Sequence, residues 1–552
     1  GDVYKRQERD RNYRLDTGVD AGWILKIVNA SEPRVESEFQ TALLDHLAVH
    51  GAHLGVPHLR ASVAGDYLPS VASASGEQHA MRLVSWLVGT PLAEAKRSFA
   101  LMSNFGRALG ELDRALQGFM HPGAVRDLDW DLRHAARSRS RLHHIKSPER
   151  RAIVERFITR FEHTVQPRLA SLRAQVIHND ANDWNILVDA ETTRHVTGFI
   201  DFGDAVHTVL IAEVAIASAY AILDMDDPIG AAAALVAGFH EKYPLQAQEL
   251  DVLFNLIAMR LVISVTFSAS RQDQTEDNPY LAISEAPAWR LLEQLDSMNP
   301  RLATGILRKA CGFDAIEGAG AVRRWIADNH TSFADLVRPS AAVLNKVIAP
   351  FGDASHEMTI ASAEQRPADA TRWWNAFSAA HNVPLAIGPW GELRTIYTDS
   401  AFESRFIKGQ RRTLHVGVDL VMPAGTPLYA PVPGTVKSVE VESDPLGYGG
   451  LVMIEHSPPG CPPFLTLWGH LAHEALSRLK AGDKLDAGDL VGYMGTDNEN
   501  GGWIPHLHLQ MTTDTQLSAS EVIGVGEPEY REVWADPVSY THLTLPTKRI
   551  VS

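Results

Sequence analysis

Apolar and polar residues follow two different patterns along the chain, and the change falls near Trp390. Before it, apolar residues recur at helical spacing, whereas beyond it short β-branched runs end at glycine turns. Helices are predicted over residues 35–49, 99–117, 147–173, 206–225, 229–243, 248–270 and 286–295, and strands over 23–28, 79–91, 186–188, 196–200, 414–420 and 505–509. We therefore expect an α+β part followed by a small, mostly-β part with an antiparallel sheet.

One hairpin in the first part carries a group of oxygen-bearing side chains. Asp180 follows a short apolar strand, Asn185 opens the next strand, and Asp201 ends the third. Phosphoryl transfer from ATP needs a carboxylate that accepts the proton of the attacking hydroxyl, and an amide and a second carboxylate that hold Mg²⁺. We therefore predict Asp180 as the catalytic base and Asn185 and Asp201 as magnesium ligands. The alternative is a polar hairpin in which these side chains only cap turns.

These residues resemble a known family. The chain is similar to the catalytic and metal-binding loops of the aminoglycoside phosphotransferase and choline kinase superfamily at His178, Asp180, Asn185 and residues 200–204. The resemblance implies the two-lobed protein-kinase fold and a need for ATP and Mg²⁺. Asn179 stands where the family usually has glycine, and we expect little effect because Asn tolerates left-handed backbone angles.

Two other segments narrow the expected phosphate acceptor. Residues 8–12 and 278–289 resemble hydroxylysine kinase-like proteins, which implies a small amino alcohol such as hydroxylysine or ethanolamine. A cationic acceptor would favour an acidic pocket. The acidic residues available for it are Glu213, Asp224, Asp226 and Asp227, of which the last three could equally lie in a solvated loop.

A lysine on an apolar strand is the candidate phosphate ligand. Lys26 shares a strand face with Ile24 and Val28, and the helix predicted after it has Glu36 and Glu38 near its start. In kinase-like folds the strand lysine binds the α- and β-phosphates and pairs with a helix glutamate. We therefore predict Lys26 with Glu38 at the nucleotide site, with Glu36 as the alternative partner. An exposed edge lysine beside a solvated helix start remains the competing interpretation.

The second part contains two strands with histidines on a shared polar face. His415 and Asp419 lie four residues apart in an alternating segment, and His506 and His508 repeat the pattern downstream. A catalytic zinc binds three such side chains and keeps one position for water. His415, Asp419 and one of the two later histidines would therefore bind zinc, and the other would handle protons. The alternative is a set of structural histidines lining a sheet.

This part resembles the lysostaphin-like zinc metallopeptidases, which cleave peptide cross-links in bacterial peptidoglycan. The resemblance spans residues 391–513 and includes residues 423–431, 467–471 and 501–503. It implies that His415, Asp419 and His508 bind zinc. It also implies that His470 and His506 orient or deprotonate the attacking water and stabilise the oxyanion.

Composition and charge limit the possible partners. The 552 residues are 45% hydrophobic and 21% charged, as in ordinary globular proteins, and a formal net charge of -16 argues against nucleic acid as a partner. The longest apolar run, residues 208–223, is interrupted by Glu213 and is too short to span a membrane, so we expect a buried helix. Cys311 and Cys461 lie far apart, which favours a reducing compartment, and we expect a cytoplasmic location.

The length predicts several domains. We expect a kinase-like domain over residues 8–335 with an incomplete first lobe, a connector of helices and loops over 336–389, and a peptidase-like domain over 390–535. Residues 1–7 and 539–552 resemble translated adapter sequence and are expected to be non-native. Two hypotheses for function remain. Either both domains are enzymes, or the β domain is a non-catalytic binding or regulatory module for the kinase.

Overall fold

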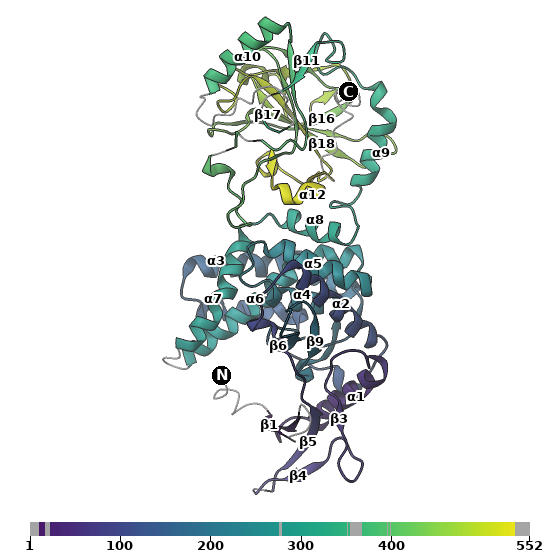
Figure 1. The fold of residues 1–552 in the computed structure, drawn as a ribbon. Helices are drawn as coiled ribbons and strands as arrows, with labels where there is room; N and C mark the ends of the chain where they lie inside the picture. Colours follow the sequence, from purple (N-terminus) through teal and green to yellow (C-terminus); the bar gives the residue numbers. More distant parts are fainter. Residues whose placement is uncertain are drawn as a thin grey trace. The chain divides into compact units, whose positions relative to one another are not determined.

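The computed structural model describes residues 10–16, 22–74, 76–274, 279–349, 351–353, 367–394, 396–397 and 399–535. The chain forms two compact units (Figure 1). Each unit has its own buried core. Unit 1 comprises residues 1–313 with 405–407, and unit 2 comprises residues 314–404 with 408–552. The segments predicted to be non-native, 1–7 and 539–552, lie outside the described residues.

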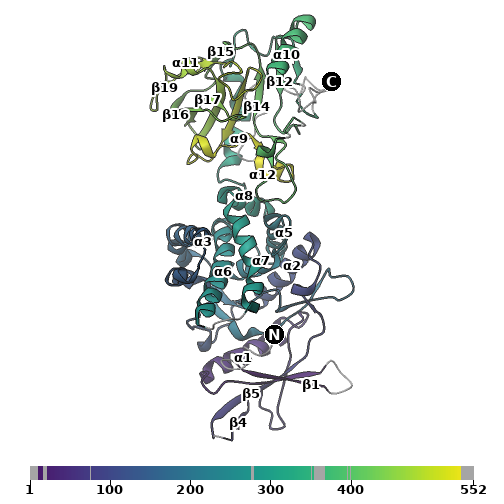
Figure 2. The ribbon, with the colours of Figure 1, turned by 90° about the vertical axis from the view of Figure 1, so that its left-hand side faces the viewer.

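Unit 1 begins with a five-stranded antiparallel sheet. Its strands are β1 (Arg11–Leu15), β2 (Trp23–Ile27), β3 (Leu59–Arg60), β4 (Ser70–Ala72) and β5 (Gln78–Ser85), in the order β1-β2-β5-β3 with β4 paired to β5. Helix α1 (Arg34–His50) packs against β3 and β5, and Figure 2 shows it beside the sheet that contains β5. Its Phe39, Leu43 and Leu47 are buried. The predicted strand that carries Lys26 and the helix after it are therefore present.

The predicted catalytic hairpin follows this lobe. Strand β7 (Ala174–Ile177) pairs with β10 (Val206–Val209), and β8 (Ile186–Val188) pairs with β9 (Val196–Phe199) and with β6 (Thr90–Pro91). The apolar side chains of β8 are buried. Burial of the strands leaves the polar residues on the loops at the strand ends, where they can reach a ligand.

Helices complete unit 1. They are α2 (Phe99–Ala115), α3 (Pro148–Arg160), α4 (Ile211–Ala221), α5 (Pro228–Lys242), α6 (Ala247–Gln274), α7 (Pro279–Asp296) and α8 (Pro300–Ala310), with short helical turns at Leu92–Glu94, Pro122–Ala124, Leu132–His144, Phe161–Val165, Gln166–Ser171 and Phe202–Asp204. Among the described residues, Ala247–Gln272 is long and apolar enough to cross a membrane, but 78% of its most apolar stretch is buried inside the protein.

Two predicted helices differ from the structure at one end. The helix predicted over 147–173 stops being α-helical at Arg160 and continues as a π-helix over Phe161–Val165 and 3-10 turns over Gln166–Ser171, which have a proline near their start. The helix predicted over 206–225 begins as strand β10, whose β-branched residues pair with β7.

Unit 2 is built on an eight-stranded sheet in the order β11-β12-β14-β21-β18-β17-β16-β19, antiparallel except between β11 and β12. These strands are β11 (Lys346–Ile348), β12 (Leu385–Gly388), β14 (Val418–Val421), β16 (Gly434–Glu442), β17 (Gly449–His456), β18 (Phe464–Leu471), β19 (Lys484–Leu485) and β21 (His506–Thr512). Two short pairs join β13 (Leu414–His415) with β22 (Val525–Gly526), and β15 (Pro427–Tyr429) with β20 (Leu490–Tyr493). The helices are α9 (Ala319–Asn329), α10 (Pro367–His381), α11 (His473–Leu476) and α12 (Arg531–Ala535), with 3-10 turns at His330–Ser332, Ser400–Phe402, Ala519–Glu521 and Pro528–Tyr530.

Two segments of unit 2 differ from the predicted pattern. Residues 336–389, predicted as helices and loops, contribute β11 and β12 to the sheet, where Leu385 and Ile387 join the core. The strand predicted over 414–420 is interrupted at Gly417, which lies against the His508 ring. A Cβ at that position would lie 2.3 Å from His508 Cε1, so the close approach requires glycine.

Candidate active sites

Asp180 lies on the loop after β7 and accepts hydrogen bonds from three donors. Its Oδ1 accepts from Arg260 Nη2 at 2.8 Å and from Asn182 Nδ2 at 3.0 Å. Its Oδ2 accepts from Asn185 Nδ2 at 2.8 Å. Burial raises the pKa of Asp180 to about 6, although the Arg260 guanidinium acts to lower it. A carboxylate that is fixed by hydrogen bonds and has a pKa near neutrality is suited to act as a general base.

Asn185 and Asp201 are close to this carboxylate. The amide nitrogen of Asn185 donates to Asp180, which leaves its amide oxygen as the atom suited to a cation. The N–H of Ile200 donates to the Asn185 carbonyl at 2.9 Å, and the charge of Asp201 acts to raise the pKa of Asp180. The structure therefore brings Asn185 into contact with the predicted base and places Asp201 near enough to act on the charge of that base.

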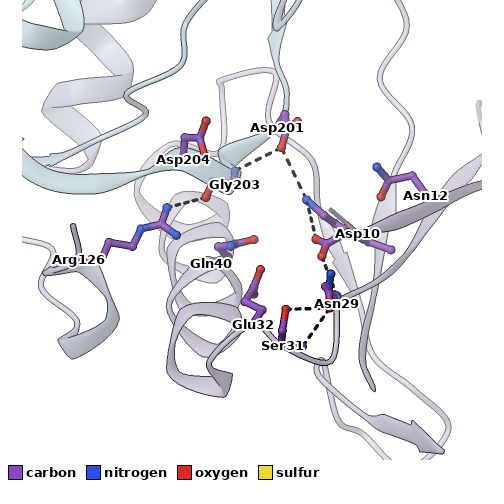
Figure 3. A pocket seen from close by; sticks show the side chains of 11 residues that line it. Asp10, Asn12, Asn29, Ser31, Glu32, Gln40, Arg126, Asp201, Gly203 and Asp204 are labelled. Carbon is purple, nitrogen blue, oxygen red and sulfur yellow. Dashed lines mark hydrogen bonds and ion pairs between the residues drawn. The ribbon is translucent and has the colours of Figure 1, made fainter. Parts of the chain in front are cut away.

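A polar cavity of about 230 Å³ adjoins Asp201 (Figure 3). Its lining includes Lys26, whose Nζ lies 3.3 Å from Asp10 Oδ2 and 3.7 Å from Asp201 Oδ1. Arg126 also lines the cavity and donates to the carbonyls of Gly203 and Ala205 at 2.5 and 2.7 Å. Two cations beside the carboxylate predicted to bind magnesium fit the phosphates of a nucleotide.

The structure does not bring Lys26 to either predicted glutamate. Glu38 lies on the exposed face of α1 and pairs with Arg34 at 3.0 Å, and Glu36 pairs with Arg126 at 2.8 Å. The carboxylates beside Lys26 come instead from Asp10 and Asp201. Helix α1 turns its buried face, which carries Phe39 and Leu43, toward the sheet, so its glutamates lie elsewhere on the helix.

The four acidic residues considered for an acceptor pocket have different surroundings. Glu213 is fully buried, and its Oε2 accepts the N–H of Asn179 at 2.9 Å. Asp224 forms an exposed ion pair, Asp226 is exposed, and Asp227 caps helix α5. Asn179 has a φ of 63°, which confirms the expected left-handed backbone, and Glu213 supports that loop.

The second site contains the predicted trio at the centre of unit 2. His415 Nε2 lies 3.2 Å from His508 Nδ1 and 3.2 Å from Asp419 Oδ1, and His508 Nδ1 lies 3.0 Å from the same oxygen. Ligand atoms of one tetrahedral zinc with bonds of about 2.0–2.1 Å lie roughly 3.3 Å apart. The three atoms therefore have the spacing and the chemistry of a zinc site. Burial lowers the pKa of His415 to about 4, so its imidazole is neutral at pH 7, as a metal ligand must be.

His470 and His506 lie beside this trio with their ring centres 4.2 Å apart. His470 Nδ1 lies 2.8 Å from the carbonyl of Asn500, and His506 Nδ1 lies 2.6 Å from that of Ile504. A carbonyl only accepts, so each Nδ1 carries the proton and each Nε2 has a lone pair. Burial lowers the pKa of both rings, which keeps them neutral. Both can accept a proton at Nε2.

Two parts of the chain match known protein families. Residues 4–250 match the Phosphotransferase enzyme family, and residues 413–519 match Peptidase family M23. Hydroxylysine kinase of Mus musculus is 30% identical over 317 residues, covering 53% of this chain and 83% of that protein. This chain belongs to the phosphotransferase family. Hydroxylysine kinase of Xenopus laevis is 29% identical over 293 residues, covering 50% of this chain and 78% of that protein. The solved amicoumacin kinase hAmiN is 14% identical with a TM-score of 0.41, covering 53% of this chain and 87% of that chain.

Both predicted resemblances are therefore confirmed, as is the fold class: a kinase-like phosphotransferase unit precedes a mostly-β M23 domain with an antiparallel sheet. Sequence reasoning missed Arg126 and Arg260 at the candidate phosphotransferase site, whereas Asp10 falls in residues 8–12, which it had singled out. The two arginines come from elements distant in sequence, and no local spacing marks them.

Two residues of the M23 site were also missed. Arg394 is buried and donates to Asp419 Oδ2 at 2.6 Å, which holds the pKa of Asp419 well below its usual range although burial acts to raise it. Gln510 Oε1 lies 3.1 Å from His508 Nε2 and so fixes the ring with Nδ1 facing the other ligands. Gln510 follows His508 by two residues on one strand, so the alternation of β21 was a signal that could have found it.

Proposed function

We propose that unit 1 transfers the γ-phosphoryl group of ATP to the hydroxyl of a small amino alcohol such as hydroxylysine or ethanolamine. The observation that carries the proposal is the contact of Asp180 with Asn185 beside Asp201 and a cavity that contains Lys26. The hydroxylysine kinases to which the chain is similar support the choice of acceptor. Because the donor is ATP, we propose a cytoplasmic location.

Each residue then has one task. Asp180 Oδ2 accepts one hydrogen bond and Oδ1 accepts two, so Oδ2 is the oxygen with capacity to take the proton of the acceptor hydroxyl. Asn185 and Asp201 would hold Mg²⁺, which offsets the charge of the phosphates when bound. Lys26 would exchange its contact with Asp10 for the phosphates.

An ATP-consumption screen over hydroxylated amines tests this function. Asp180→Asn should lower kcat at least about 100-fold, since a positioned general base contributes roughly 10²–10⁴, while the KM for ATP stays within a few-fold. Asp45→Asn, an exposed change on α1, is the matched control and should behave as the unaltered protein. The proposal is wrong if no hydroxylated amine is phosphorylated, or if Asp180→Asn retains full turnover.

We further propose that unit 2 is a zinc-dependent hydrolase of a peptide or related amide, with His415, Asp419 and His508 as ligands. Their donor atoms lie within 4.8 Å of one another and are fully or almost fully buried. A bound zinc would polarise the scissile carbonyl and favour deprotonation of water. His470 and His506 would accept and return that proton at Nε2. Peptides of the peptidoglycan type are the first substrates to test, given the match to Peptidase family M23.

Metal analysis combined with peptide cleavage separates an enzyme from a binding module. The protein should bind one zinc per chain, and His470→Ala and His506→Ala should each lower cleavage of short peptides and peptidoglycan fragments about 100-fold or more without loss of the metal. His381→Ala, an exposed change on α10, is the control. If zinc binds but both variants match the unaltered protein, the domain is a non-catalytic module of the kinase.

A further inference from the structure

An arginine in the middle of an apolar helix contacts the catalytic base. Arg260 lies on α6, where its neighbours Met259 and Leu261 are fully buried, and its own exposure is 2%. A buried cation is unfavourable unless other groups compensate it, and apolar residues often stabilise such a position better. Core packing therefore gives no reason for arginine at this position.

The contacts of Arg260 converge on Asp180. Its Nη2 donates to Asp180 Oδ1 at 2.8 Å, and its Nη1 donates to the carbonyl of Trp130 at 3.1 Å. The guanidinium also lies over the rings of Trp130 and Tyr220, with centroid distances of 4.8 and 5.4 Å. The rings of Trp130 and Tyr220, the Trp130 carbonyl and a hydrogen bond with the Tyr220 side chain hold the guanidinium in place, and from there Nη2 donates to the carboxylate.

We propose that Arg260 is a positioning residue for phosphoryl transfer: it holds Oδ1 of Asp180 so that Oδ2 faces the acceptor hydroxyl. This inference rests on the proposed phosphotransferase function. Asn182 and Asn185 also hold the carboxylate, but both lie on the same loop and would move with it. Arg260 is the contact that connects the carboxylate to the helical core.

The guanidinium is suited to this role because it is itself fixed between two rings and forms a charge-assisted hydrogen bond to the carboxylate. A displacement of about 1 Å in a catalytic group costs on the order of 100-fold in rate.

A double-mutant cycle in the full chain tests the role. Arg260→Met should lower kcat for the amino alcohol about 10- to 100-fold, with little change in the KM for ATP. Arg260→Lys should lose less, because one ammonium can reach Asp180 but cannot also donate to Trp130. In the Asp180→Asn background, Arg260→Met should cost less than twofold, since a residue that acts only through Asp180 has nothing left to position. Arg308→Met removes another buried arginine of unit 1, paired with Asp251, and is the control for general destabilisation.

The results distinguish failure of the positioning role from failure of the proposed function. The proposal is overturned if the losses in kcat of the two single variants multiply in the double variant. It is also overturned if the kcat of Arg260→Met stays within twofold of that of the unaltered protein. If Arg260→Met does not fold, the same double-mutant cycle with Arg260→Lys in its place tests the proposal. If the unaltered protein phosphorylates no hydroxylated amine, the proposed function fails, and crystal structures still test Arg260. In the crystal structure of Arg260→Met, the Asp180 carboxylate should be rotated relative to the unaltered protein. A carboxylate that keeps its orientation and its contacts to Asn182 and Asn185 overturns the proposal.

Discussion

Single buried side chains set the chemistry of both units, and burial also makes them sensitive to pH. His456 in unit 2 is 1% exposed, with Nδ1 2.9 Å from the carbonyl of Pro433 and Nε2 2.8 Å from Thr466 Oγ1. Burial lowers the pKa of His456 to about 4. It does not contact the candidate zinc ligands, so its titration can be studied separately.

We expect unit 2 to lose stability in acid through this histidine. The unfolded chain has a histidine pKa of about 6.5, so between pH 6.5 and 4 the unfolded state binds more protons than the folded state. Stability therefore falls as pH falls through this window, by up to roughly 3 kcal/mol for His456 alone. Urea unfolding at several pH values should show a smaller loss in His456→Gln than in the unaltered protein. Equal slopes for the two proteins would show that His456 does not titrate as described.

At the scale of elements, helices α2 and α5 approach each other through glycines. A Cβ added at Gly106 would lie 1.8 Å from the carbonyl oxygen of Leu235, and one at Gly238 would lie 2.1 Å from that of Ser103. Backbone atoms cannot move aside as a side chain can, so any larger residue must push the helices apart.

Gly106→Ala should therefore destabilise unit 1 by about 3 kcal/mol. In an open helix the same change would stabilise by about 1 kcal/mol, so the sign of the effect reports the contact. Urea unfolding of unit 1 measures it, with Ala100→Ser on the exposed start of α2 as the control. A neutral or stabilising Gly106→Ala would mean that the two helices do not pack at this distance.

The same scale shows where pattern reading succeeds. Long apolar periodicity located α1, α2, α5 and α6, and the alternation at residues 505–509 located β21. Pattern reading failed at β10, where strand formation depends on pairing with the distant strand β7. It also failed at Gly417, where the ring of His508 from another strand packs against the backbone. Periodicity reports which face is buried, but not what it is buried against.

At the scale of the whole molecule, two separate cores predict two independent responses to ligands. Zinc should stabilise unit 2, and Mg²⁺ with an ATP analogue should stabilise unit 1, each by about 2.7 kcal/mol of unfolding free energy at 100 times the Kd. Each ligand should therefore raise the unfolding temperature of its own unit. Calorimetry of the full chain measures both transitions. His415→Ala should abolish only the zinc response and Asp201→Ala only the nucleotide response. If either variant abolished both the zinc response and the nucleotide response, the two units would not respond independently.

The sequence by itself determined the residues that lie close together along the chain: Asp180 with Asn185 and Asp201, and His415 with Asp419. Loop and strand geometry over a few residues places such side chains together whatever surrounds them. Strand alternation predicted that His506 or His508 would join His415 and Asp419 at a shared ligand, and only the family resemblance implied His508.

Only the tertiary structure decided the charges around these groups. Lys26 faces Asp10 rather than a glutamate of α1, Arg260 reaches Asp180 from 80 residues away, and Arg394 holds Asp419 from 25 residues away. A buried charge takes its partner from whatever element packs beside it, and that depends on the whole core, which no local spacing records.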